Sequence, residues 1–197
     1  MDQASNLRKH FEEGIDLRRK MADTMPADIA RAGEALAQAL KAGRKVLSCG
    51  NGGSAADSQH FAAELVGRFE RERPGLAGIS LTTDTSALTA IANDYDFNRV
   101  FSKQVEALGQ AGDFLLGIST SGNSKNVIEA IKAAQARSMG VIALTGRDGG
   151  EMGRIMRPGD FHLNVAHPRT MRVQEIHLLV IHCLCEVVDN VIFGERK

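Results

Sequence analysis

Four side chains that can bind metals or transfer protons, His60, Glu64, Gln174 and His182, occur as two pairs with helical spacing. His60 and Glu64 are four residues apart, so both project from one face of a helix. Gln174 and His182 are eight residues apart, which places them about 80° apart around a helix axis, and they can therefore share a face. His177 lies on the other side of Gln174, about 140° from His182, and is less suited to converge on the same point.

If these two helices face each other, the four residues form a nitrogen and oxygen ligand set suited to zinc or a similar divalent ion. The same carboxylate and imidazoles, partly desolvated, could instead move protons in catalysis. A carboxylate held tightly by a metal is a poorer base, and the residues alone do not decide between the two roles. The alternative for each histidine is a hydrogen-bonded core residue without a role in chemistry.

The first of two candidate anion-binding loops has the sequence GNGGS at residues 50–54, between the apolar run 45–49 and the helix that carries His60. The glycines allow the backbone to approach an anion closely, and the serine can cap the following helix. The N–H groups and the dipole of that helix then face the anion. We expect this loop to bind phosphate.

The second loop, STSGNS at residues 119–124, also comes between an apolar run and a helical segment. Its hydroxyls and backbone N–H groups match the acceptor oxygens of a phosphate monoester, although serine-rich turns often only cap helices. Both loops follow predicted parallel strands, and ligands of open α/β sheets bind along that edge. Neither loop has the lysine of the Walker motif or the G-x-G-x-x-G spacing, so a small sugar phosphate fits better than ATP or NAD.

Asn93 and Asp94 end a predicted helix, 86–92, with polar groups of the kind that bind sugar hydroxyls. The same pair is an ordinary end to a helix, and this alternative stays open.

The elements that must position these residues follow from the apolar periodicity. Helical patterns cover residues 4–21 and 27–42, with Pro26 between them where a helix can restart. Short apolar runs at 45–49, 77–81, 113–118, 140–144 and 160–165 predict strands, each leading through a polar loop into a helix. Strands that alternate with helices predict a parallel sheet covered on both faces. The closing segment 172–193 predicts one long buried helix capped by Gly194.

Composition limits the class of protein. The 197 residues carry 24 Lys plus Arg and 24 Asp plus Glu, so no global field attracts nucleic acid or an acidic membrane. No apolar run is expected to approach the length of a membrane span, no leader segment is recognised, and three cysteines are read as buried, reduced thiols of a cytoplasmic protein. The charged run 68–73 is interpreted mostly as a solvated helix end, whose arginines could still meet a partner or an anion.

Taken together, the motifs closely resemble those of the phosphoheptose isomerase family of sugar isomerase (SIS) domain proteins. The resemblance runs nearly end to end, and the residues that carry it are the loop 50–54 with Asp57, segment 59–61 with Glu64, segment 92–94, loop 119–124, segment 144–150, and Gln174 to His177 with His182.

The resemblance implies a flavodoxin-like three-layer α/β/α sandwich with a five-stranded parallel sheet, formed by residues 1–197 as a single SIS domain. The N-terminal helices within residues 1–42 would serve assembly into a homotetramer, although their apolar stripe suits packing within the chain equally well. The implied reaction converts D-sedoheptulose 7-phosphate to D-glycero-D-manno-heptose 7-phosphate, on the route to ADP-heptose and the lipopolysaccharide core. Active sites in this family lie at subunit interfaces.

The resemblance also implies a role for each matching position. Glu64 and His182 would transfer protons. Zinc, one ion per subunit, would be held by the same two residues together with His60 and Gln174. The residues expected to bind substrate are Asn51, Gly52, Gly53, Glu64, Asn93, Asp94, Ser119, Thr120, Ser121, Ser124 and Gln174, with the four hydroxyl residues on the phosphate.

One rival interpretation keeps the fold and removes the catalysis. Initiator-associating SIS proteins are tetrameric adaptors for a DNA-replication initiator, and segments 68–74 and 183–185 resemble them at least as closely. A regulator that senses a sugar phosphate is a third interpretation, which needs the phosphate loop but not the proton-transferring pair. The sequence leaves open the metal's identity, the anomer bound, which subunit supplies each site residue, and a second role in replication.

Overall fold

Five parallel strands form the centre of the protein, whose computed structural model describes residues 2–195. The sheet order is β2-β1-β3-β4-β5. The strands are β1 (Val46–Gly50), β2 (Gly78–Ser80), β3 (Phe114–Ser119), β4 (Gly140–Gly146) and β5 (Phe161–Val165). Gly50 pairs with Ile118 across the β1–β3 ladder. The loops that follow β1 and β3 therefore leave the same edge of the sheet as neighbours.

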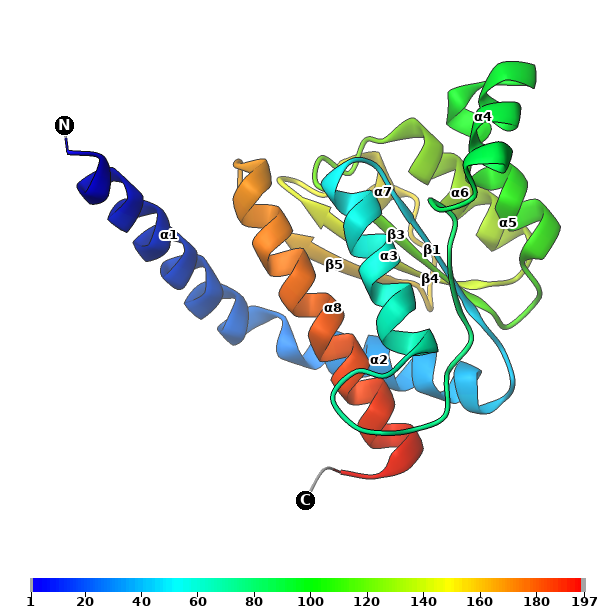
Figure 1. Cartoon of the computed structure of the whole chain (residues 1–197), viewed down its shortest axis with the longest axis horizontal. Coiled ribbons are helices and arrows are strands. Elements are labelled where there is room, and N and C mark those ends of the chain that lie inside the picture. Colours follow the sequence, from blue (N-terminus) through cyan, green and yellow to red (C-terminus); the bar gives the residue numbers. More distant parts are fainter. Residues whose placement is uncertain (1, 196–197) are drawn as a thin grey trace.

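Helices cover both faces of the sheet (Figure 1). Leu116 packs on the side of α2 (Pro26–Lys41), α3 (Gly53–Val66) and α8 (Thr170–Phe193). Leu115, the preceding residue, packs on the side of α5 (Ser102–Leu108), α6 (Lys125–Ala136) and α7 (Gly150–Arg154). Strand side chains alternate between faces, so one apolar run supplies two cores. The predicted three-layer α/β/α sandwich is confirmed.

The predicted elements agree with the observed ones to within a few residues. The two N-terminal helices are α1 (Gln3–Thr24) and α2, and Pro26 occupies the first turn of α2, where its missing N–H costs nothing. Gly194 ends α8 in the left-handed region, with φ of 86°, which glycine adopts without strain. Ends that differ by one or two residues are normal for helices and strands.

Helix α8 requires one correction. By length and composition alone it is apolar enough to cross a membrane, so the expectation that no apolar run approaches that length is wrong. The helix packs against α2 and α3, and its side chains at Val173, Val180 and Leu184 belong to the core. Its apolar composition is accounted for by burial between neighbouring helices.

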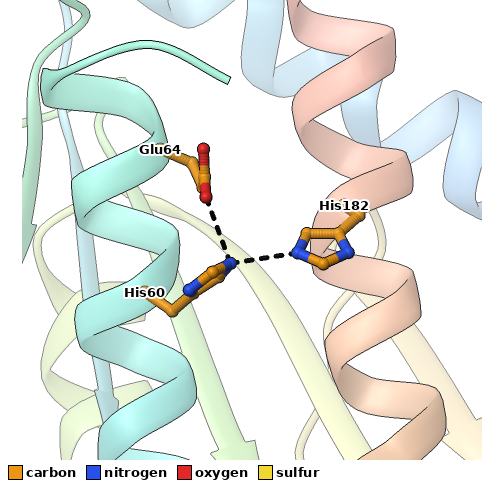
Figure 2. A group of neighbouring side chains, drawn as sticks. All are labelled: His60, Glu64 and His182. Atoms are coloured by element: carbon orange, nitrogen blue, oxygen red, sulfur yellow. Dashed lines mark hydrogen bonds and ion pairs between the residues drawn. The ribbon is translucent and has the colours of Figure 1, made fainter. Parts of the chain in front are cut away.

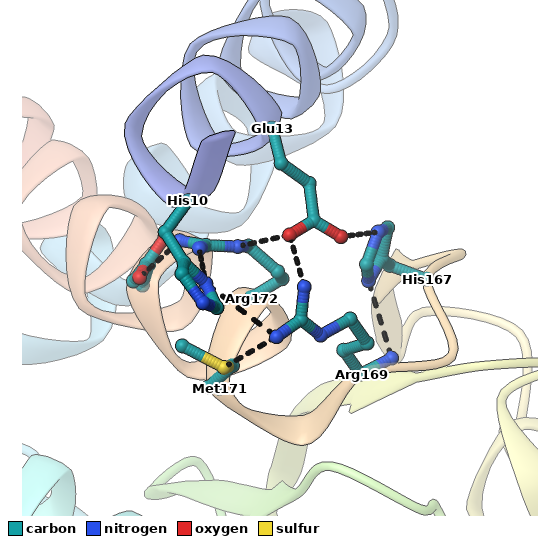
Figure 3. Close-up of polar contacts among 7 residues, drawn as sticks. His10, Glu13, His167, Arg169, Met171 and Arg172 are labelled. Carbon is teal, nitrogen blue, oxygen red and sulfur yellow. Dashed lines mark hydrogen bonds and ion pairs between the residues drawn. The ribbon is translucent and has the colours of Figure 1, made fainter. Parts of the chain in front are cut away.

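Helix α1 extends from the body of the molecule, with the N-terminal end far from the sheet (Figure 1). Charged side chains tie its middle to the start of α8, as Figure 3 shows. The guanidinium of Arg172 donates to Glu13 at 3.0 Å and to His10 Nδ1 at 3.0 Å, while Arg169 and His167 also pair with Glu13. The hydrogen bond from Arg172, with the nearby charges, lowers the pKa of Glu13 against a smaller opposing effect of burial.

Candidate active site

Helices α3 and α8 bring together three of the four predicted residues, His60, Glu64 and His182, which we call the His60 group. His60 Nε2 lies 3.0 Å from His182 Nε2 and 3.2 Å from Glu64 Oε1, and Figure 2 shows the three side chains meeting between α3 and α8. One ligand atom from each residue lies within 4.8 Å of the others. The side chains of His60 and Glu64 are 41% and 20% exposed, so solvent and substrate can reach the group. Helices far apart in the sequence thus place one carboxylate and two imidazoles at one point.

The donor set fits a divalent cation. His60 Nε2 carries at most one proton, yet it faces both an imidazole nitrogen and a carboxylate oxygen, so lone pairs converge on the space between the three residues. A tetrahedral zinc with ligand distances of about 2.0–2.1 Å holds its donor atoms roughly 3.3 Å apart, close to the two separations from His60 Nε2. Two imidazoles and a carboxylate are ligands that zinc accepts.

Gln174, the fourth predicted ligand, lies at a different level along the contact between α3 and α8. Its amide lies against Gly53, the first residue of α3, where a Cβ would collide with Nε2. His60 is seven residues further along α3, a rise of about 10 Å. The amide therefore borders the loop 50–54, which we call the glycine loop. The role of Gln174 as a metal ligand stays a prediction.

Asp57 lies on the same helical face, one turn before His60. Its Oδ2 atom is buried and has no hydrogen-bond partner among the described residues. Burial raises the pKa of this carboxyl group, and the nearby His60 opposes the rise. Sequence reasoning included Asp57 only as part of the family motif and gave it no role.

In the serine-rich loop 119–124, which we call the hydroxyl loop, the side-chain hydroxyls form a small concave group, the hydroxyl cup. Ser119 Oγ lies 2.8 Å from Ser124 Oγ and 3.4 Å from Ser121 Oγ. Ser124 is the N-cap residue of α6, but its side chain makes no capping bond, so its hydroxyl remains available within the loop. Three hydroxyls thus gather at a helix N-terminus, an arrangement typical of phosphate sites. Thr120 is half-buried in the same loop.

The loop before α7 and the first turn of that helix pack against the hydroxyl loop. Gly122 has φ of 66°, and a Cβ there would collide with the carbonyl oxygen of Gly149. The Met152 N–H donates to Gly122 O at 2.9 Å, and the Glu151 N–H donates to Asn123 Oδ1 at 2.9 Å. Only glycine at 122 permits the close approach of the two backbones.

The glycine loop and the hydroxyl loop are joined by a pair of amides. Asn51 Nδ2 donates to Asn126 Oδ1 at 2.9 Å, and Asn126 Nδ2 donates back to Asn51 Oδ1 at 2.8 Å. Asn126 is buried in the first turn of α6. Gly52 follows Asn51 in the glycine loop. Its φ of 56° turns the chain into α3. Sequence reasoning missed Asn126, whose only signal is its place two residues after the hydroxyl loop.

Asn93 and Asp94 lie at the exposed end of α4 (Thr85–Asp94), which projects away from α1 (Figure 1). The Asn93 amide donates to Asp94 Oδ1 at 2.8 Å. Within residues 2–195, no recorded hydrogen bond joins this pair to the hydroxyl loop or to the His60 group. Its predicted contact with sugar stays a prediction.

His177 points into the core, and it does not join the His60 group, in line with its helical angle to His182. Its Nε2 lies 2.9 Å from Thr145 O in β4, and the ring is fully buried. Burial lowers the pKa of His177 to about 4, despite the opposing bond to Thr145. The ring is therefore neutral at pH 7 and separate from the His60 group.

The three cysteines are free thiols, as expected, with Cys49 and Cys185 buried and Cys183 half-buried. Burial raises the pKa of Cys49 to about 12 and raises that of Cys185 as well. The His60 group is the one potential metal cluster of acidic, histidine and cysteine side chains in the described part of the chain, and it contains no thiol.

The charged run 68–73 was interpreted as mostly solvated, and this is wrong for Arg73. Its side chain is 1% exposed and forms an ion pair at 2.7 Å with Asp189 of α8, which is 6% exposed. The sequence could not indicate this burial because the partner is more than a hundred residues away.

Comparisons with known proteins agree with this geometry. Residues 9–146 match the family model described as SIS domain. The chain is 58% identical to phosphoheptose isomerase of Laribacter hongkongensis, over 98% of this chain and 99% of the relative. It is 60% identical to phosphoheptose isomerase of Neisseria meningitidis serogroup C, over 93% of each chain. The solved structure of phosphoheptose isomerase GmhA from Neisseria gonorrhoeae superimposes with a TM-score of 0.92, at 54% identity, and the match covers 96% of this chain and all of that one.

Proposed function

Given that the chain belongs to the phosphoheptose isomerase family of SIS-domain proteins, we propose that it converts D-sedoheptulose 7-phosphate to D-glycero-D-manno-heptose 7-phosphate. The product supplies the heptose of ADP-heptose and the lipopolysaccharide core. The observation that carries the proposal is that His60 and Glu64, on the helix that begins at the glycine loop, meet His182 of α8.

The phosphate binds in the hydroxyl loop. Ser119, Thr120, Ser121 and Ser124 offer hydroxyl donors to its oxygens, and the N-terminus of α6 adds backbone N–H groups and a favourable dipole. No lysine is required, because several neutral donors can satisfy a phosphate monoester.

The sugar chain then extends toward α3. Asn51, Gly52 and Gly53 contact its hydroxyl groups, and Gln174, whose amide borders Gly53, extends that surface. Asn93 and Asp94 bind the sugar in the assembled protein. The shared hydrogen bonds of Asn51 and Asn126 hold the two loops at a fixed separation, which suits one length of substrate.

Proton transfer follows from the chemistry of the ketose. Glu64 removes a proton from C1, which the C2 carbonyl acidifies, and the C1–H electron pair forms the C1–C2 double bond of an enediol. Glu64 returns the proton to C2, while His182 moves a proton from O1 to O2, so that C1 becomes the aldehyde and C2 an alcohol. Each acid–base step contributes about 10²–10⁴-fold, and anchoring of the phosphate supplies further acceleration.

A zinc ion, one per subunit, would be held by His60, Glu64 and His182 with Gln174 as the fourth ligand. The convergence of three donor atoms within 4.8 Å supports this assignment. Such an ion would supply Lewis-acid polarisation of a substrate oxygen next to these residues. Gln174 would have to leave its place against Gly53 to complete the set.

The protein assembles as a cytoplasmic homotetramer. Leu7, Phe11 and Ile15 form an exposed apolar stripe on α1, and Phe11 is 75% exposed. With Met171 the stripe borders a groove of about 540 Å³ between α1 and α8. Apolar surface of this kind typically packs against another subunit.

The non-catalytic adaptor for a replication initiator receives no support from the comparisons, whose reported relatives are named phosphoheptose isomerase. The proposal is tested by incubating the purified protein with sedoheptulose 7-phosphate, with and without a chelator, and following the product by NMR. Formation of the aldoheptose phosphate is expected, and a chelator-sensitive rate is expected if zinc takes part. Absence of turnover under both conditions and after added Zn²⁺ would reject the isomerase.

A further inference from the structure

The seam between α3 and α8 is held by contacts on either side of the His60 group. At one end the Gln174 amide lies against Gly53, the first residue of α3. At the other end Arg73 forms its buried ion pair with Asp189. Asp189 is seven residues after His182, two turns along the same face of α8.

Arg73 also holds the last turn of α3 directly. Its Nη2 donates to the carbonyl oxygen of Glu64 at 2.7 Å, and its Nη1 donates to that of Leu65 at 2.8 Å. These are among the last four carbonyls of the helix, which have no partners within it. A cation at this end is also favoured by the helix dipole. The guanidinium thus binds the backbone of the proposed base and, through Asp189, the helix of the proposed acid.

We propose that the buried Arg73–Asp189 ion pair is a positioning device, which sets the separation of Glu64 and His182 by fixing the end of α3 against α8. The inference deepens the proposed function, because it assigns a reason for the geometry of the same site. A buried ion pair is a poor source of stability compared with an apolar pair of similar volume. A planar guanidinium with five fixed donors does, however, impose one geometry on the groups it binds.

The test replaces both charges together with apolar side chains, in the variant R73M/D189L. We expect its thermal midpoint to fall only modestly, because no unpaired charge is left buried, although the carbonyl of Glu64 loses its donor. We expect kcat to fall about 10–100-fold, since small displacements of catalytic groups have effects of this size. KM should change less than about twofold, because the hydroxyl loop that binds phosphate is untouched.

A matched control lies just before β3, the central strand of the sheet. Asp113, just before β3, is 1% exposed in its side chain and pairs with Lys45. Asp113→Asn removes a buried carboxylate of the same type and should lower the thermal midpoint without changing kcat.

A second readout needs neither turnover nor metal. In metal-free protein labelled with ¹⁵N-histidine, R73M/D189L should shift the ring nitrogen signals of His60 and His182, whereas Asp113→Asn should not. Wild-type kcat together with wild-type ring signals in R73M/D189L would overturn the inference. If the wild type itself shows no turnover, the proposed function fails and the ring signals alone decide the positioning role.

If R73M/D189L does not fold, Arg73→Lys gives the same decision. Lysine keeps the charge beside Asp189 but cannot reproduce the fork that binds two carbonyls. An unchanged kcat in this variant would also contradict the proposal.

Discussion

His60 Nε2 faces an imidazole nitrogen at 3.0 Å and a carboxylate oxygen at 3.2 Å, an arrangement in which a single proton cannot satisfy both neighbours. At the scale of the residue, the site is therefore built for a cation or for a proton in transit.

The hydroxyl loop gives a prediction about binding. Ser119→Ala with Ser124→Ala removes the two hydroxyls that lie 2.8 Å apart, and we expect the dissociation constant for substrate to rise about tenfold or more. Isothermal titration calorimetry measures it. Thr24→Ala, which removes an exposed hydroxyl from α1, is the control and should leave affinity unchanged. Unchanged affinity in the double variant would contradict the phosphate assignment.

His177 gives a prediction about pH. Its pKa is about 4 in the folded protein and near 6.5 when unfolded, so below pH 6.5 the unfolded state binds more protons. The stability that the neutral ring contributes is fully present above pH 6.5 and is lost as pH falls toward 4, by about 3 kcal/mol.

Denaturant unfolding between pH 7 and pH 4 measures this loss. His177→Gln keeps a donor for the carbonyl of Thr145 but does not titrate, so the loss should be smaller in the variant. Identical pH dependence in the two proteins would show that other groups carry it.

At the scale of the element, several contacts between elements require glycine, because a Cβ would block the close approach. Gly122 reaches the backbone of Gly149 because neither residue has a Cβ, and this brings the α7 loop behind the hydroxyl cup. At Gly53 the missing Cβ leaves room for the Gln174 side chain, which brings α8 against α3.

Gly122→Ala should therefore do more than strain the backbone. A left-handed residue other than glycine costs about 1–2 kcal/mol, and the collision with Gly149 adds to it. Gly159 has φ of 96° with no neighbour within 4 Å of a Cβ, so Gly159→Ala should show the backbone cost alone. We expect Gly122→Ala to be the less stable variant by urea unfolding and to raise KM, whereas equal losses in the two would argue against the support of the cup.

The elements themselves could be predicted from the sequence because each depends on local pattern. The apolar run 113–118 predicts a strand, and the glycine loop predicts the helix that begins at Gly53, from residues that are neighbours in the sequence. The partners of Arg73 and Asn51 could not be predicted, since Asp189 and Asn126 are distant in the chain and nothing in their local sequence marks them. Gln174 shows the remaining difficulty, because helical angles gave its face but not its level along α3.

At the scale of the whole molecule, the exposed stripe on α1 is the feature that a single chain does not explain. Leu7, Phe11 and Ile15 lie on one face of the N-terminal half of α1. The N-terminal end of this helix extends away from the sheet (Figure 1). Burying such side chains against another copy would contribute about 1.5–3 kcal/mol for each large residue.

Phe11→Glu should weaken assembly, because it would place a charge in an apolar contact. Analytical ultracentrifugation should show a smaller species than the tetramer expected for the wild type. Lys9→Glu changes the charge on the other side of α1 and should leave the mass unchanged. A tetramer that persists in Phe11→Glu would remove this face from the interface.

The central claim is that Glu64 is the base of a sugar-phosphate isomerase, and the most direct measurement compares the wild type with Glu64→Gln on sedoheptulose 7-phosphate by NMR. Glutamine keeps the size of the side chain and loses its basicity. We predict that the wild type forms the aldoheptose phosphate, while the folded variant forms it at least about 100-fold more slowly. Turnover at the wild-type rate in Glu64→Gln would contradict the account.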